Sequence, residues 1–383
     1  MIEALFPISE YWSWGTFALY FIIAVTVVTI CKSGCNAQKI GMSKSDVNFR
    51  YFFAFLILVL LATLRSEEVG TDTDHYISYF QYATSFNFDW SRLFTFKQME
   101  PGFQYYLYLL RKITDNYTFY FFVTYSIIAY GYIAFIKYFT KDVSNLTFLQ
   151  LFIFFYVSNM SGARSALGTF FILFSFIALD KKKYFKAILL TFCACTFHYT
   201  MIFNFIIIAG YWIFSKKFFN SNRSIWIVMV CVMAVLSSSA SFFIKGIFSD
   251  TKYDFYSSVS TEELSLLGSI FYLFYFVLCI IYYQKLLKDK PTLLIITMLL
   301  MVAYPFLFIT GAFRIPNYYA LPRLVIWCQM SDYIEENEKS PQGKQIVRIA
   351  IQAVVLLYML FRFTRAAEDS GFQYILLDKF RLW

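Results

Sequence analysis

Three arginines stand beside small or polar residues, a setting that suits the binding of a phosphate group. They are Arg65, Arg164 and Arg314. An arginine guanidinium offers five N–H donors in a planar fork that matches phosphate oxygens two at a time. Taken singly, each arginine has an ordinary alternative, which is to extend its side chain to lipid headgroups. Taken together, the three favour a shared site for an anion such as a diphosphate.

Carboxylates follow the first of these arginines. Asp72 and Asp74 lie directly after Gly70, which permits a tight turn, and Glu100 comes further along. Such carboxylates can bind sugar hydroxyls or a cation, or act as a general base. A D-x-D pair also holds a metal in soluble sugar-nucleotide transferases, but two such residues occur equally in ordinary solvated acidic turns. No metal site is expected, because the seven cysteines lie in or beside apolar segments and the two histidines are far apart.

Two further side chains stand out because they are polar within apolar surroundings. His198 ends a run of small apolar residues, and a histidine titrates near neutral pH. It therefore serves either as a catalytic base or as a structural donor. Arg323 lies within an apolar run, where a charge facing lipid would be costly. It either lines a cavity or extends inward past Trp327.

The composition shows what kind of scaffold must position these residues. The chain of 383 residues is 59% hydrophobic and only 15% charged, whereas soluble proteins carry about 25% charged residues. This composition excludes a soluble domain, a disordered chain and a disulfide-built module. Apolar runs recur from end to end, with lengths that suit a hydrocarbon core of about 30 Å. We therefore expect an all-α, polytopic membrane protein with a single membrane-embedded domain over residues 1–383.

The apolar runs predict about twelve transmembrane helices. They cover residues 11–31, 51–64, 117–139, 146–159, 165–179, 185–197, 200–214, 225–238, 266–283, 293–310, 316–330 and 349–361. Two longer connections separate them, at 65–116 and 239–265. Within the first connection, residues 102–113 place apolar side chains at helical spacing beside Arg111 and Lys112. This pattern predicts a helix that lies in the membrane interface or re-enters the membrane.

The net charge of +9 is explained by topology rather than by nucleic acid. The basic residues form short clusters between the apolar runs, and cytoplasmic loops of membrane proteins are enriched in Lys and Arg. With the N-terminus outside, the inner loops hold about 19 of the 33 basic residues and about 8 of the 24 acidic ones. Both termini and both long connections are then outside. The residues capable of chemistry consequently gather at the outer ends of helices.

Five short motifs occur in order between residues 65 and 319. They are Arg65 with GTDTDHY at 70–76, EPGF at 100–103, GARSAL at 162–167, FHYT at 197–200, and Arg314 followed by Tyr318 and Tyr319. In order and spacing they resemble the motifs R…GTD…Y, E.GF, R(Q)…A, H(F/Y)S and R…Y of the EpsG-like Wzy polymerases. That family makes O-antigen, capsular and exopolysaccharide chains. Two positions differ, because Ser165 stands where Gln is common and Thr200 stands in place of Ser.

The resemblance implies a membrane glycosyltransferase, GT-C-like, in the bacterial inner membrane. It would transfer a glycan from undecaprenyl diphosphate onto a lipid-linked oligosaccharide repeat unit at the outer face. The expected base is His198, Asp72, Asp74 or Glu100. The residues expected to bind diphosphate and sugar are Arg65, Arg164, Arg314, Arg323, Tyr76, Tyr318 and Tyr319. No cofactor is expected, since the donor carries its own leaving group; the expected partners are the lipid-linked substrate, the bilayer and a chain-length regulator protein.

Two other functions fit part of the pattern. A flippase for the same lipid-linked sugar would also have about twelve spans, but transporters place their polar residues near the bilayer midplane in repeated halves. No internal repeat is present here. An O-antigen ligase would also use outer-face arginine and histidine. Its large outer loop typically comes late in the chain, whereas the longest connection here is early.

The charge distribution predicts the orientation of both ends of the chain. Reporter fusions after Glu68 and after Arg365 should be active only when the reporter works outside the cytoplasm. A cytoplasmic reporter that is active at either position would contradict this topology. Fusion after Lys183, in a predicted inner loop, is the matched control with the opposite expected result.

Overall fold

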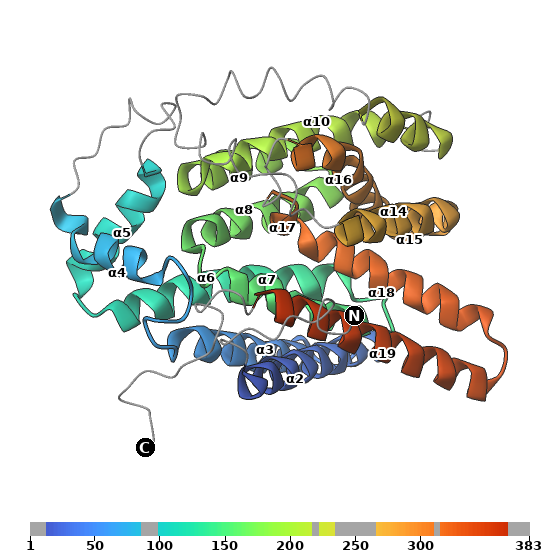
Figure 1. Cartoon of the computed structure of the whole chain (residues 1–383), viewed down its shortest axis with the longest axis horizontal. Helices are drawn as coiled ribbons and strands as arrows, with labels where there is room; N and C mark the ends of the chain where they lie inside the picture. The colour runs from blue at the N-terminus through green and yellow to red at the C-terminus, as the bar shows by residue number, and fades with distance from the viewer. Residues whose placement is uncertain (1–12, 86–98, 217–221, 234–265, 310–314, 367–383) are drawn as a thin grey trace.

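The computed structural model describes residues 13–85, 99–216, 222–233, 266–309 and 315–366, and these ranges contain helices and no strands (Figure 1). The first half holds α2 (Trp14–Lys39), α3 (Lys44–Thr63), α4 (Thr73–Gln81), η1 (Ala83–Ser85), α5 (Pro101–Ile113), α6 (Tyr117–Phe139), η3 (Thr147–Leu151), α7 (Phe152–Ser158) and α8 (Ala163–Asp180). The second half holds α9 (Tyr184–Phe197), η4 (Tyr199–Ile202), α10 (Phe203–Phe214), α14 (Leu266–Ile281), α15 (Tyr283–Asp289), α16 (Pro291–Ile309), α17 (Ile315–Tyr318), α18 (Ala320–Asn337) and α19 (Pro341–Ala366). The all-α fold class is confirmed.

Five of these helices are long and apolar enough to cross a membrane: α2, α3, α6, α8 and the stretch Pro341–Phe363 of α19. Six shorter apolar helices accompany them, at Thr147–Ser158, Tyr184–Phe197, Tyr199–Phe214, Ser224–Met233, Tyr272–Ile281 and Pro291–Tyr304. Each of the twelve predicted runs thus contains helix, with α18 corresponding to 316–330. The number of complete membrane crossings stays a prediction, since the shorter helices need flanking residues or a thinned bilayer to span it.

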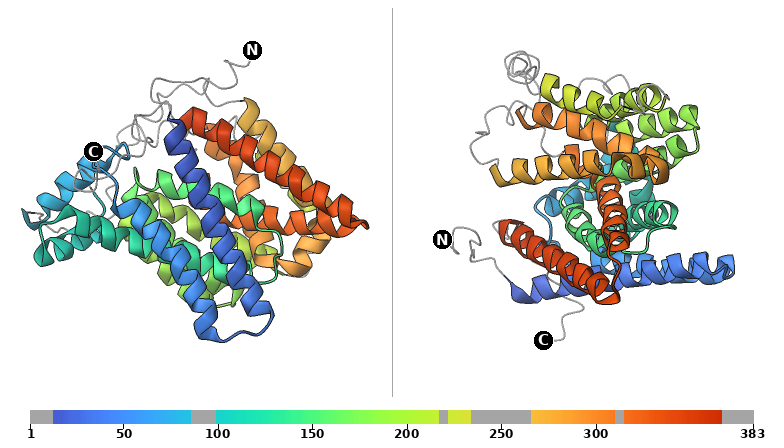
Figure 2. Two further views of the ribbon diagram at one scale, coloured as in Figure 1. Left: turned by 90° about the horizontal axis from the view of Figure 1, so that it is seen from below. Right: turned by 90° about the vertical axis from the view of Figure 1, so that its right-hand side faces the viewer.

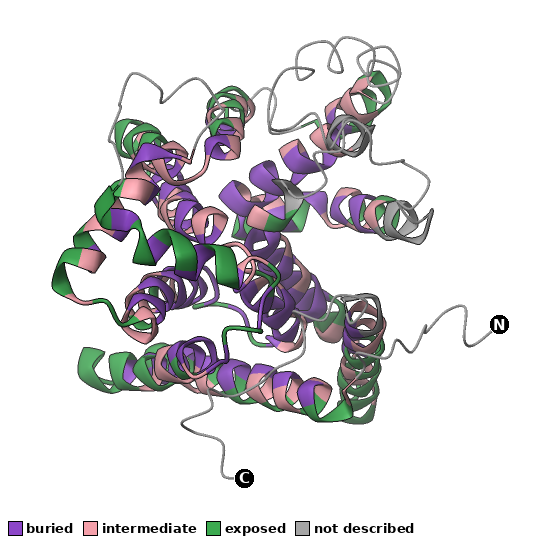
Figure 3. Ribbon diagram, turned by 60° about the vertical axis from the view of Figure 1, so that its left-hand side comes forward, coloured by how far each residue is buried: buried purple, intermediate pink, exposed green. Residues whose placement is uncertain are grey.

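The surface of the bundle is apolar in a way that suits lipid. Large hydrophobic side chains point outward on the peripheral helices, including Phe49 (61% exposed), Phe185 (80%) and Ile349 (60%). Figure 3 shows buried residues in the centre of the bundle and exposed ones on its outward faces. A water-soluble monomer rarely exposes large contiguous apolar patches. The chain is a helical membrane protein.

Helix packing proceeds largely through neighbours in the sequence. The α2–α3 hairpin packs on α6, α6 on α8, and α8 on α9. The first and last described helices also meet: the ring of Phe363 on α19 lies 5.3 Å from that of Phe17 on α2 (Figure 2). In the interior, Asn204 donates hydrogen bonds to Ser175 (3.2 Å) and Thr191 (2.8 Å), which joins α8, α9 and α10. Such side-chain bonds hold helices together where lipid removes the hydrophobic driving force.

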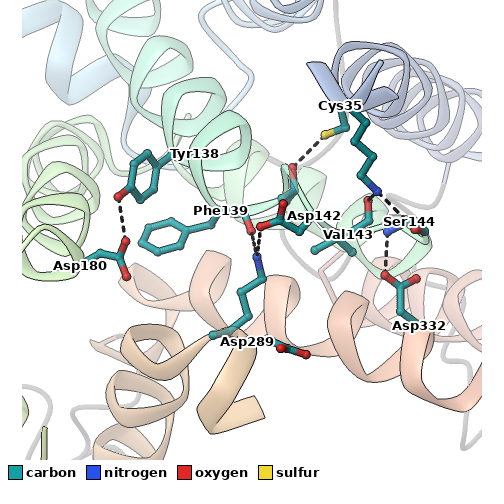
Figure 4. Close-up of polar contacts among 12 residues, drawn as sticks. Cys35, Tyr138, Phe139, Asp142, Val143, Ser144, Asp180, Asp289 and Asp332 are labelled. Carbon is teal, nitrogen blue, oxygen red and sulfur yellow. Dashed lines mark hydrogen bonds and ion pairs between the residues drawn. The ribbon is translucent and has the colours of Figure 1, made fainter. Parts of the chain in front are cut away.

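Polar contacts join the predicted inner loops to one another (Figure 4). The carboxylate of Asp332 accepts hydrogen bonds from the backbone N–H groups of Ser144 and Asn145, both at 2.7 Å. Lys39 donates to the carbonyl of Val143 (3.3 Å), and Lys290 donates to that of Phe139 (2.9 Å). The end of α6 and the segment that follows it are therefore held by residues from α2 and α18 and by Lys290, the C-cap of α15. This grouping agrees with the topology, whose orientation in the membrane stays a prediction.

The segment 65–116 is more structured than a simple connection. Its described residues include α4, η1 and α5, which lie together at one end of the bundle, at the left of Figure 1. The helix predicted at 102–113 is confirmed as α5, with Phe103, Leu107 and Leu110 buried against the protein. Its position in the membrane interface stays a prediction. The second long connection, 239–265, lies outside the described residues.

Asp332 should be essential to the stability of the predicted inner end. Replacing it in an Asp332→Ala variant leaves the N–H groups of Ser144 and Asn145, of which the second is buried, without their charged acceptor, which should cost about 1–3 kcal/mol. The measurement is the midpoint of thermal unfolding of the detergent-purified protein, which should fall. Glu336→Ala, an exposed acid on the same helix, should leave the midpoint unchanged. Equal midpoints for both variants would contradict this role.

Candidate functional site

A fully buried carboxylate is the centre of the candidate site. Glu100 has an exposed fraction of 0%, and its Oε2 accepts a hydrogen bond from Nη1 of Arg164 at 2.8 Å. Its Oε1 lies 3.3 Å from Nδ1 of His198 and accepts the backbone N–H of Tyr199 at 3.4 Å. A buried charge is tolerated only when it is paired and hydrogen-bonded. Both oxygens of Glu100 meet this condition.

Two tyrosines extend this arrangement. The hydroxyl of Tyr318 lies 3.2 Å from Nε2 of His198, so both ring nitrogens of the histidine have partners. Tyr76 on α4 lies close enough to Arg164 for the two side chains to influence each other electrostatically. Burial raises the pKa of Tyr76 to about 12, against the opposing effect of the Arg164 cation, so its phenol stays protonated at neutral pH. We call Glu100, Arg164, His198, Tyr76 and Tyr318 the Glu100 cluster.

The acid, the cation and the histidine of this cluster each occupy a helix end. Glu100 is the N-cap of α5 and precedes Pro101, which favours an extended backbone at the residue before it. Arg164 lies in the first turn of α8, after the N-cap Gly162. His198 is the C-cap of α9, with φ −156° and ψ 118°. The fold therefore brings three helix ends together at one end of the bundle.

A close contact between α5 and α9 sets the distance between Glu100 and His198. A Cβ on Gly102 would lie 2.3 Å from Oγ1 and 2.8 Å from the carbonyl oxygen of Thr196. Only glycine allows this approach, because the carbonyl cannot move aside without disturbing α9. Thr196 is two residues before His198, so the contact fixes the acid and the histidine relative to one another.

The geometry indicates how the histidine can work. The buried carboxylate favours a proton on Nδ1 of His198, which leaves Nε2 as an acceptor facing the hydroxyl of Tyr318. In this arrangement Glu100 orients the ring and stabilises its protonated form. Nε2 can accept a proton from a hydroxyl group placed near Tyr318. Arg164 balances the charge of Glu100 and is itself 26% exposed.

Several residues predicted for the site lie outside the Glu100 cluster. Arg65 is buried and donates to the hydroxyl of Tyr125 at 3.0 Å. The guanidinium of Arg323 lies 5.4 Å from the centre of the Tyr272 ring. Tyr319 is fully buried, with its ring 5.7 Å from that of Phe176.

The two aspartates of the D-x-D pair lie at the start of α4. Asp72 is its half-buried N-cap, and Asp74 is exposed in the first turn. No described contact joins either carboxylate to Glu100. Arg314 lies outside the described residues. Within them, no group of three or more His, Cys, Asp or Glu side chains is close enough to hold a metal ion.

Sequence reasoning named all five members of the Glu100 cluster as candidate site residues but did not predict their pairing. Glu100 was a candidate base and Arg164 a candidate phosphate ligand, yet they contact each other across 64 positions. The N–H of Tyr199 carries no sequence signal as a donor. Tyr125, which contacts Arg65, is one of 31 tyrosines, and nothing in its surroundings distinguishes it.

The close contact at Gly102 gives a test of the site geometry. A Gly102→Ala variant should separate α5 from α9 and weaken the Glu100–His198 contact, because the new methyl group overlaps the Thr196 carbonyl. Displacement of a catalytic group by about 1 Å can lower a reaction rate about 100-fold. The variant should therefore lose most of its activity, although the protein is still present in the membrane. Gly15→Ala, where a Cβ would meet only Oγ of Ser13 at 3.6 Å, is the matched control and should keep normal activity. Normal activity of Gly102→Ala would contradict the assignment.

Comparison with known proteins identifies the family of the chain. The model of the EpsG family matches residues 48–376, a range that contains every member of the Glu100 cluster. No curated protein and no solved structure matches the chain. Since the family match covers most of the 383 residues, the chain belongs to the EpsG family, which supports a role of the polysaccharide-polymerase type.

Proposed function

We propose that this protein is a polysaccharide polymerase that transfers a glycan from undecaprenyl diphosphate onto a lipid-linked oligosaccharide repeat unit. The reaction takes place at the outer face of the inner membrane. The observation that carries the proposal is His198, with Nδ1 against buried Glu100 and Nε2 facing the Tyr318 hydroxyl. A histidine supported in this way suits general base catalysis on a hydroxyl group. Family membership supports the substrate class.

The proposed reaction exchanges one glycosidic C–O bond for another. The acceptor sugar hydroxyl attacks the anomeric carbon of the donor glycan while its proton passes to Nε2 of His198. The bond between that carbon and the diphosphate breaks, and undecaprenyl diphosphate leaves with the electron pair. Glu100 stabilises the imidazolium that forms, because its carboxylate lies against Nδ1. Since the diphosphate is already a good leaving group, the step requires no nucleotide.

Binding of the leaving diphosphate is the second part of the proposed mechanism. The exposed part of the Arg164 guanidinium is proposed to bind an oxygen of the leaving diphosphate, while Nη1 stays on Glu100. Arg314 is proposed as a second ligand of the same diphosphate. Tyr76 and Tyr318 are proposed to contact the sugars, since their hydroxyls adjoin Arg164 and His198. Asp72 and Asp74 would then contribute to sugar binding rather than to proton transfer.

The arrangement favours this function over a flippase. Transporters place coupled polar residues near the bilayer midplane. Here the Glu100 cluster is built from helix ends: the N-cap of α5, the first turn of α8 and the C-cap of α9. An active site at one membrane face suits an enzyme whose substrate has two parts: the glycan, which lies in water, and the lipid anchor, which lies in the bilayer.

The proposal predicts that His198 and Glu100 affect turnover more than substrate binding. A His198→Asn variant should lower the rate of polymerisation by about 10²–10⁴-fold, the usual contribution of a general base. Glu100→Gln should lower it less, because the amide still accepts from Arg164 but no longer stabilises the imidazolium. Rates are measured on purified protein in proteoliposomes with lipid-linked repeat units. In cells, both variants should produce glycans of a single repeat unit.

The controls separate this proposal from its rivals. Glu68→Gln, an exposed acid in the same segment, should polymerise normally, and each variant must be present in the membrane at the normal level. Long glycans from His198→Asn cells would remove the histidine as the base. Loss of even the single-unit product would indicate a flippase or a ligase instead.

A further inference from the structure

Arg65 is held in an aromatic enclosure rather than at a surface. Its exposed fraction is 1%, and its guanidinium carbon lies 4.5 Å from the centre of the Phe121 ring and 4.6 Å from that of Tyr125. Nη2 donates to the Tyr125 hydroxyl at 3.0 Å and to the carbonyl of Met160 at 3.3 Å. Rings on a guanidinium provide cation–π attraction, which is stronger when water is excluded. Nε and Nη1 of Arg65 are also buried, without a hydrogen-bond partner among the described residues, so a phosphate could reach the guanidinium only if this enclosure opened.

The motif that follows Arg65 surrounds the same carbonyl. Oγ1 of Thr73 and the hydroxyl of Tyr125 lie 3.3 Å and 3.4 Å from the Met160 oxygen. Gly70 has φ +98°, and a Cβ there would lie 2.8 Å from that oxygen. The backbone N–H of Thr71 donates to Oγ of Ser161 at 3.0 Å. Residues 65–73 thus contact the turn at 159–162, which we call the Met160 turn.

The Met160 turn leads directly into α8. Gly162 is the N-cap of that helix, and Arg164 stands in its first turn. A shift of the turn therefore shifts the guanidinium that bonds Glu100 at 2.8 Å. Arg65 is thus connected to Glu100 through the carbonyl of Met160, the four residues 161–164 and the ion pair of Arg164.

We infer that Arg65 is a positioning residue, which fixes the Met160 turn and thereby directs Arg164 at Glu100, and that it does not bind the diphosphate. The R…GTD motif is on this basis a scaffold for the site: Arg65 and Thr73 act on the Met160 carbonyl, and Gly70 permits the close approach. The kinetic part of the test rests on the proposed function. The structural part does not.

The kinetic test uses residues that reach the Met160 turn but lie outside the Glu100 cluster. Tyr125→Phe and Thr73→Val should lower polymerisation turnover with KM for the lipid-linked donor unchanged, as should Arg65→Lys, which keeps the charge but loses the planar fork. We expect a loss of roughly tenfold or more, since small misplacements of catalytic groups cost this much. Combining any of them with Arg164→Lys should add little further loss, because they act through the same residue.

A matched control keeps this test specific. Tyr211→Phe removes a buried tyrosine hydroxyl that bonds Thr292 at 3.1 Å, far from the Met160 turn, and should polymerise normally. The inference is overturned if Arg65→Lys raises KM with turnover unchanged while Tyr125→Phe and Thr73→Val behave as the parent. That result would show Arg65 binding the diphosphate directly.

A second measurement does not depend on enzymatic activity. A Thr71→Cys, Ser161→Cys double variant should form a disulfide on mild oxidation, detected by mass spectrometry of the linked peptides. Adding Arg65→Lys should lower its yield several-fold at equal protein level. An unchanged yield overturns the inference. If the parent protein makes no polymer but the yield still depends on Arg65, the proposed function fails and the positioning role stands.

Discussion

The buried ion pair between Glu100 and Arg164 is the constraint on which this end of the bundle depends. A carboxylate without exposed surface is stable only if the fold delivers a cation and further donors to it. Those donors come from the first turn of α8 and from the residues after α9. Three helices must therefore have an end at one place, and the site uses residues from those ends: the caps Glu100 and His198 and, in the first turn of α8, Arg164.

This requirement explains several features that are otherwise unrelated. Gly102 allows α5 to lie against Thr196, which brings the acid to the histidine. The contacts around Met160 hold the start of α8, which brings the arginine to the acid. A helix interior is rigid, whereas the position of a helix end depends on the residues packed against it. The distances between the side chains of the site are therefore fixed by contacts just outside it.

At both ends of the bundle, side chains bond the backbone groups of a turn between helices. At the predicted inner end, Asp332 and Lys290 satisfy backbone groups of the segment after α6. At the other end, Arg65 and Thr73 do so for the Met160 turn. In both places charged or hydroxyl side chains complete the hydrogen bonding of a turn between helices. In a membrane protein this matters because buried backbone groups have little water to bond.

Much of this protein follows from the sequence alone, because its determinants are local. Apolar runs at helical length predict the helices, and the spacing of Phe103, Leu107 and Leu110 predicts α5. Glu100, Arg164 and His198 stand out as charged or titratable groups beside apolar segments. Only the tertiary structure decided how they combine, because Glu100 meets Arg164 and His198 across 64 and 98 positions. For the same reason Arg65, which has the same local signal as Arg164, packs against two aromatic rings of α6 instead. Helix packing, and not residue type, selects the partner of each charge.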